Sequence, residues 1–193
     1  MTQTVEQLDV RFGDACRTVL DEIRRLFAAM DGDSWTQASE LITGARAVHV
    51  IGSGRSGLAA QMAAMRLMHL GLRVHVAGEC TAPAIAAGDT LVAVSGSGTT
   101  ESAVRAADTA RDHGAGVVAV TAAPKSPLAE RADVVIVLPA SDKQDHSGAI
   151  SRQYAGSLFE QAVLLGFDAQ FLVLWAESAQ TAERLWERHA NIG

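Results

Sequence analysis

Short runs of valine, isoleucine, leucine and alanine alternate with amphipathic segments through the middle of the chain. The runs are almost continuously apolar, which is typical of parallel strands that are buried on both faces of a sheet. Five such runs are present, at residues 46–52, 72–77, 89–95, 115–122 and 133–139. Helical patterns separate several of them, at 56–71, 100–114 and 126–132. This alternation predicts an α/β fold, a three-layer sandwich with a five-stranded parallel sheet flanked by helices.

Helical arms are expected at both ends of the chain. Apolar residues recur at helical spacing between Val5 and Met30, and Ser34 is placed to cap a second helix over residues 35–45. Two more helices are expected over 157–178 and 179–193. The large apolar faces of these arms suggest an oligomer. Since no linker or repeat divides the chain, we expect a single domain over 1–193 with helical N- and C-terminal arms.

Composition and charge argue against several classes of protein. The formal net charge of −6 does not provide the basic face that nucleic-acid binding usually needs. No apolar run approaches the ~20 residues that span a bilayer, and the N-terminus lacks a signal pattern, so no membrane partner is expected. The two cysteines, Cys16 and Cys80, lie far apart in the sequence. We expect both to be reduced and buried or half-buried, in a cytoplasmic protein.

Two glycine-rich loops each join a predicted strand to a predicted helix. The first, GSGRSG at 52–57, matches the G-x-G-x-x-G pattern of dinucleotide-binding folds, and Glu79 lies near the end of the next strand, where such folds place an acid. A tight turn without a ligand is the other alternative, because glycine also serves packing. The second loop is SGSGTT at 95–100. Ligands of parallel sheets bind beyond the carboxyl ends of the strands, so both loops can face one crevice.

The second loop favours a small monophosphate. The hydroxyls of Ser95, Ser97 and Thr100, together with backbone N–H groups, could surround a phosphate at a helix N-terminus. No lysine and no Walker spacing accompany them, so a triphosphate with magnesium is not expected. Simple N-capping of the helix accounts for one hydroxyl, whereas the loop carries four in six residues.

Together the two loops resemble those of the sugar isomerase (SIS) domain family of phosphosugar binders. The stretches GRSGLAAQMAAMRLMHLG, SPLAERAD, QYAGSLFEQA and RHAN are similar, more narrowly, to the 6-phospho-3-hexuloisomerase family, over nearly the whole chain. This resemblance implies a flavodoxin-like sheet and an isomerase that converts D-arabino-3-hexulose 6-phosphate to fructose 6-phosphate through an enediol, in formaldehyde fixation by the ribulose monophosphate pathway. It also implies that no cofactor is used and that the enzyme is a homotetramer. Thr99 is a departure, because the family usually has glutamate there.

The resemblance further implies roles for individual residues. Glu160 would move the proton between C2 and C3 as the catalytic base, and His189 would assist from its own or an adjacent subunit. Arg55 would stabilise the enediolate or contact sugar hydroxyls. The expected substrate-binding residues are Gly54, Arg55, Ser56, Ser95, Gly96, Ser97 and Thr100. No metal is expected, since no pair of histidines and acids has the spacing of a metal site.

Three alternatives remain open at this stage. The chain could isomerise another phosphosugar, such as an arabinose 5-phosphate-like substrate, it could bind a phosphosugar without turning it over, or it could bind a nucleotide through GSGRSG. Two polar residues of the stretch after the last strand, His146 and Gln153, could approach the ligand, and Gln153 is the candidate to cap the pocket.

Overall fold

The computed structural model describes residues 11–140 and 150–192. Its strands are β1 (Val48–Gly52), β2 (Val74–Val76), β3 (Thr90–Val94), β4 (Gly116–Thr121) and β5 (Val134–Val137). They form one sheet in the order β2-β1-β3-β4-β5, and every neighbouring pair is parallel. The five-stranded parallel sheet is therefore confirmed, with the strand order of flavodoxin-like folds.

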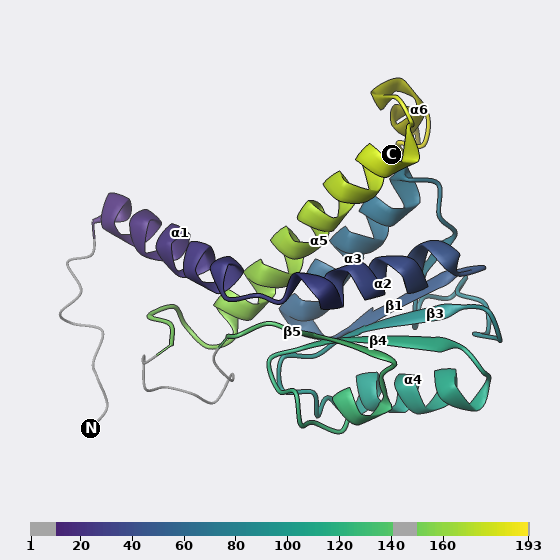
Figure 1. Ribbon diagram of the computed structural model, residues 1–193, viewed down its shortest axis with the longest axis horizontal. Coiled ribbons are helices and arrows are strands. Elements are labelled where there is room, and N and C mark those ends of the chain that lie inside the picture. The colour runs from purple at the N-terminus through teal and green to yellow at the C-terminus, as the bar shows by residue number, and fades with distance from the viewer. Residues whose placement is uncertain (1–10, 141–149, 193) are drawn as a thin grey trace.

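Helices cover both faces of the sheet, as the sequence predicts (Figure 1). The helices α2 (Gly32–Gly44), α3 (Gly54–His69) and α5 (Ser157–Ser178) pack on one face, and α4 (Glu101–Asp112) packs on the other beside the 3-10 turn η2 (Ala129–Arg131). Alternate side chains of β3 pack into two hydrophobic cores, one on each face of the sheet. Val92 and Val94 pack toward α3 and α5, whereas Leu91 and Ala93 pack toward α4. This alternation explains why the strand is apolar throughout.

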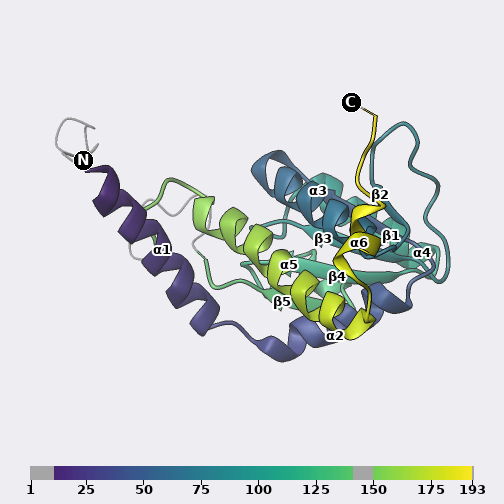
Figure 2. The same ribbon diagram turned by 90° about the horizontal axis from the view of Figure 1, so that it is seen from above.

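The helical arms differ in how they join this body. α1 (Phe12–Ala28) projects away from the sheet, and it contacts α5 (Figures 1 and 2). At the other end, α6 covers only Ala182–Trp186, so the long terminal helix expected over 179–193 is wrong. The chain breaks there because Ala179, directly after α5, has a positive φ of 55°, and Thr181 starts a new turn by accepting a hydrogen bond from the Arg184 N–H.

α5 is the central helix of the layer formed by α2, α3 and α5, and it contacts α1, α2 and α3. By length and composition alone it could cross a membrane, but more than half of its most apolar window is buried inside the fold. Trp35 of α2 packs edge-on against Phe167 of α5, and Gly166 provides the space, since a Cβ at Gly166 would lie 2.5 Å from the Trp35 ring. The apolar character of α5 thus fits a helix that packs in the core of the fold.

Two local expectations were wrong. α2 begins earlier than predicted, because Asp31 caps it by accepting hydrogen bonds from the N–H groups of Asp33 and Ser34. A carboxylate satisfies two N–H groups of the first turn, whereas Ser34 lies inside the helix. Both cysteines are free, and Cys16 is half-buried as predicted, but Cys80 is exposed in the loop after β2.

Candidate active site

The two glycine-rich loops lie side by side at the carboxyl ends of β1 and β3. The parallel register pairs Gly52, the last residue of β1, with Val94, the last residue of β3. Because β2 lies on one side of this pair and β4 on the other, the winding of the sheet reverses here, where α/β folds bind their ligands. A small cavity of about 60 Å³ opens between the loops, lined by Ser53, Ser56, Val94, Ser95, Gly96, Ser97 and Thr100.

The glycines of the first loop allow a close approach of backbone to backbone. A Cβ at Gly57 would lie 2.7 Å from the carbonyl oxygen of Gly52, so the start of α3 packs directly on the end of β1. Gly54 has a positive φ of 58°, which side chains disfavour. Close packing at Gly52 and Gly57 and the backbone conformation at Gly54 therefore account for the G-x-G-x-x-G pattern without a bound dinucleotide. The first loop contributes Ser53 and Ser56 to the polar lining of the cavity.

Ser56 presents a buried hydroxyl to the cavity. Its side chain is 2% exposed, and its hydroxyl has no hydrogen-bond partner in the described part of the chain. A buried hydroxyl without a partner is costly, and such groups in native proteins usually meet water or a ligand. The hydroxyl lines the same cavity as the second loop, so an oxygen-rich ligand group fits there.

The second loop is held in shape by its own hydroxyls. Ser95 Oγ lies 2.8 Å from Thr100 Oγ1 and accepts a hydrogen bond from the Gly98 N–H at 3.1 Å. Ser97 Oγ lies 2.9 Å from Thr99 Oγ1. Thr100 is the N-cap residue of α4 but its side chain caps no helical N–H group, so the simple capping alternative is wrong for this hydroxyl. The N-terminus of α4 therefore faces the cavity without a side-chain cap, as an anion site requires.

Glu160 and Arg55 join this group from two helices. Glu160 lies in the first turn of α5 and forms an ion pair with Arg55, the second residue of α3. The two side chains are 8% and 64% exposed, respectively. Phe159 fixes the start of α5 against the second loop, since a Cβ at Gly96 would lie 3.3 Å from its ring. The structure thus brings the predicted base, a cation and the hydroxyl loops to one end of the sheet.

His189 does not belong to this group within one chain. Its ring stacks between Trp186, at 4.4 Å between ring centroids, and His69, at 4.1 Å. His69 is the last residue of α3, whereas Gly54 at the cavity is the first, and a helix of 16 residues separates its ends by about 22 Å. The predicted catalytic histidine and the predicted base are therefore far apart in the same chain.

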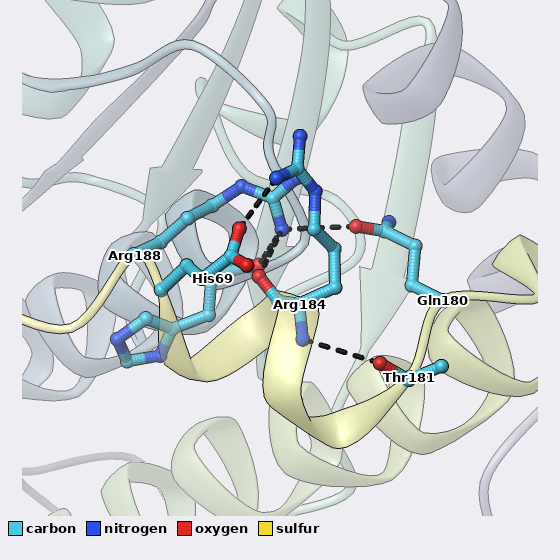
Figure 3. A network of polar contacts seen from close by, with 6 residues as sticks. His69, Gln180, Thr181, Arg184 and Arg188 are labelled. Carbon is cyan, nitrogen blue, oxygen red and sulfur yellow. Dashed lines mark hydrogen bonds and ion pairs between the residues drawn. The ribbon is translucent and has the colours of Figure 1, made fainter.

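A network of hydrogen bonds fixes the C-terminal segment in this place (Figure 3). The Arg188 guanidinium donates to the His69 carbonyl and to Gln180 Oε1, both at 2.9 Å. Gln180 in turn donates to the carbonyl of Leu70. Burial lowers the pKa of His69, and the nearby His189, Arg66 and Arg188 lower it further. The segment that carries His189 is thus held as one unit on the far end of α3.

The remaining polar candidates have other positions. Gln153 does not line the cavity; it bonds to Glu22 and Gln161. His146 lies outside the described residues. Ser53 was missed, although its place in GSGRSG before α3 could have marked it. Among residues 11–140 and 150–192, no group of three histidine, cysteine or acidic side chains is placed to hold a metal ion.

Comparisons with known proteins place this site in a family. The SIS domain family model matches residues 41–165, which include both loops and Glu160. A protein of Mycobacterium gastri named 3-hexulose-6-phosphate isomerase is 51% identical, over 90% of this chain and 87% of its own. A Bacillus subtilis protein of the same name is 36% identical, over 90% and 95% of the two chains.

A solved structure agrees with these relatives. The crystal structure of a Methanococcus jannaschii protein, for which a molecular function of 3-hexulose-6-phosphate isomerase was inferred, superimposes with a TM-score of 0.81 and 27% identity, over 93% of this chain and 99% of that one. The chain belongs to the SIS domain family of phosphosugar isomerases. Within that family it groups with the 3-hexulose-6-phosphate isomerases, since the relatives of 51% and 36% identity both carry that name and each aligns with 90% of this chain.

Proposed function

We propose that this protein interconverts D-arabino-3-hexulose 6-phosphate and fructose 6-phosphate. The observation that carries the proposal is that one end of the sheet holds both a cavity lined by serine and threonine hydroxyls and a nearly buried carboxylate paired with arginine. The names of the relatives that are 51% and 36% identical support the same substrate. The reaction moves a carbonyl from C3 to C2, which needs proton transfer and no net oxidation.

The hydroxyl cavity binds the phosphate group. Ser56, Ser95, Ser97 and Thr100 supply neutral donors, and the N-terminus of α4 adds N–H groups and the positive end of its dipole. Gly54 and Gly96 keep the backbone close to the ligand. The Ser56 hydroxyl, which has no partner among the described residues, gains one when the phosphate binds.

Glu160 transfers the proton. Its carboxylate takes the proton from C2 while the C3 carbonyl oxygen takes up a proton, which gives a 2,3-enediol. The 2-hydroxyl then gives up its proton as the proton held by Glu160 is returned to C3, which leaves the carbonyl at C2 and a hydroxyl at C3. The Arg55 guanidinium orients the carboxylate and offers its donors to the enediolate oxygens. A single base serves both steps, so the proposal needs no cofactor and no metal.

His189 acts in the site of a neighbouring copy. Since it lies at the far end of α3 from Glu160 of its own chain, a contribution to catalysis needs a second subunit. The exposed apolar residues Leu20 of α1, Leu172 of α5 and Trp186 of α6 are suited to such an assembly, which we propose to be a homotetramer in the cytoplasm. There His189 assists proton transfer or the opening of the fructose 6-phosphate ring.

A coupled assay tests the function directly. 3-Hexulose 6-phosphate is generated in situ from formaldehyde and ribulose 5-phosphate, and the formation of fructose 6-phosphate is followed. Turnover supports the proposal. Binding of phosphosugars without turnover contradicts it and identifies a phosphosugar-binding protein or an isomerase of another sugar, whereas thermal protection by NAD but not by phosphosugars identifies a nucleotide-binding domain.

A further inference from the structure

A buried carboxylate of the N-terminal arm is not explained by the site described above. Glu22 lies in the middle of α1 and is 3% exposed. Its Oε2 accepts hydrogen bonds from Ser151 Oγ at 2.7 Å and from Gln153 Nε2 at 3.0 Å, and its Oε1 accepts one from the Arg152 N–H at 2.8 Å. All three donors come from consecutive residues of the segment that leads into α5.

The carboxylate is charged at neutral pH. Burial raises the pKa of Glu22, but the hydrogen bonds from Arg152, Ser151 and Gln153 and the charge of Arg25 outweigh it, and the net pKa is lowered. A buried charge seldom stabilises a fold more than an apolar side chain of the same size would. What the Glu22 carboxylate does provide is a fixed geometry for its three partners, which belong to an irregular segment.

A chain of hydrogen bonds continues from Glu22 to the start of α5. Gln153, whose amide nitrogen donates to Glu22, accepts through its oxygen a hydrogen bond from Gln161 Nε2 at 2.8 Å. Gln161 follows Glu160 directly in the first turn of α5. The same turn is anchored by the Ser157 N–H, which donates to the carbonyl of Tyr154. Glu22 is thus connected through Gln153 to Gln161, the residue beside the proposed base.

We propose that Glu22 is a positioning residue of the isomerase, which holds residues 151–153 and, through Gln153 and Gln161, the first turn of α5 so that the Glu160 carboxylate meets Arg55 and the substrate. This inference rests on the proposed function of Glu160. The arm helix α1 thereby does more than offer an apolar face to other subunits, because it contributes one side of the scaffold of the catalytic base.

The test compares Glu22→Gln with Asp21→Asn, its neighbour on α1. Asp21 is exposed and, within residues 11–140 and 150–192, pairs with Arg24 one turn away, so its variant controls for charge on the helix. Misplacement of a catalytic group by about 1 Å can cost about 10²-fold in rate. We expect Glu22→Gln to lower kcat by about 10- to 100-fold with little change in KM. Asp21→Asn should keep the kcat and KM of the wild type. If Glu22→Gln and Asp21→Asn have equal kcat values at a temperature well below the melting temperatures of both variants, the proposal is overturned.

Two further measurements separate positioning from folding. Gln153→Ala breaks the chain of hydrogen bonds outside the core, and we expect its effect on kcat to be non-additive with that of Glu22→Gln. Full additivity contradicts the route through Gln153. Hydrogen exchange of the amides of Ser157 and Glu160, both hydrogen-bonded, needs no activity. Faster exchange confined to this turn in Glu22→Gln supports positioning even if the wild type proves to use another sugar, and unchanged exchange contradicts it.

Discussion

Arg55 and Glu160 are 105 residues apart in the sequence and form an ion pair between the first turns of α3 and α5. The carboxylate is almost buried, whereas the guanidinium is largely open to solvent on its other side. This asymmetry suits a base that must stay in place and a cation that must reach a ligand. The contact between Gly57 and Gly52 that places the start of α3 is local in the sequence. The ion pair itself depends on the packing of α3 against α5.

The first prediction concerns Arg55. Arg55→Ala removes the donors offered to the enediolate and the partner that orients Glu160, so we expect kcat to fall by about 10²- to 10³-fold, as for the loss of an oxyanion donor. Arg55→Lys keeps the charge but loses the planar fork, and we expect an intermediate kcat. Steady-state kinetics with both variants provides the measurement. Wild-type kcat in Arg55→Ala would show that the ion pair is only structural.

The second prediction concerns the phosphate cavity. Ser56→Ala removes a buried hydroxyl that has no partner among the described residues, so we expect the free protein to keep its stability or gain a little. The bound state loses a hydrogen bond, and the affinity for phosphosugar should fall about 10-fold, equivalent to roughly 1.4 kcal/mol. Calorimetric titration with fructose 6-phosphate checks this. An unchanged affinity would place the phosphate elsewhere.

A third prediction uses the backbone of the second loop. Gly98 has a positive φ of 63°, and a Cβ there would lie 1.9 Å from Ser126 Oγ. Gly98→Ala should therefore destabilise the protein by at least about 1–3 kcal/mol. Gly44→Ala is the matched control, because nothing lies within 4 Å of its Cβ position, and it should shift stability by less than about 1 kcal/mol. Urea unfolding of the two variants measures both changes in the free energy of unfolding. Equal unfolding midpoints for Gly98→Ala and Gly44→Ala would contradict the described loop geometry.

The sequence predicts the sheet and the two loops well because their signals are local. Strand runs, glycine turns and hydroxyl clusters depend on neighbours along the chain. Packing decides what the sequence could not show. The role of Glu22 depends on residues near 152, about 130 positions away, and the separation of His189 from Glu160 follows from the length of α3. The terminal helix was overestimated because helical periodicity continues past the point where the backbone turns at Ala179.

A fourth prediction concerns the pH dependence of stability. Burial lowers the pKa of His49, assisted by His75 and Arg46 and opposed by Asp89. Because the folded state holds this histidine neutral, the unfolded state takes up a proton first as the pH falls below about 6.5. The free energy of unfolding should therefore decrease from that pH down to the folded pKa. His49→Gln should show a weaker slope in urea unfolding between about pH 5 and 7. An identical slope would mean that folding does not lower the pKa of His49.

A fifth prediction addresses the place where His189 acts. Glu160→Gln and His189→Ala variants are each expected to be inactive or nearly so when pure. If each site combines Glu160 of one copy with His189 of another, mixed oligomers formed by co-expression should recover about a quarter of the wild-type activity, since random assembly completes one site in four. No recovery in mixed oligomers would contradict a contribution across the subunit interface.

The most direct test of the central claim is the coupled assay of wild type beside Glu160→Gln. The variant keeps the size and position of the side chain and removes the base. We expect fructose 6-phosphate formation to fall by about 10²- to 10⁴-fold while the affinity for phosphosugar stays within a few-fold of wild type. Turnover by the variant at the wild-type rate would show that Glu160 is not the base.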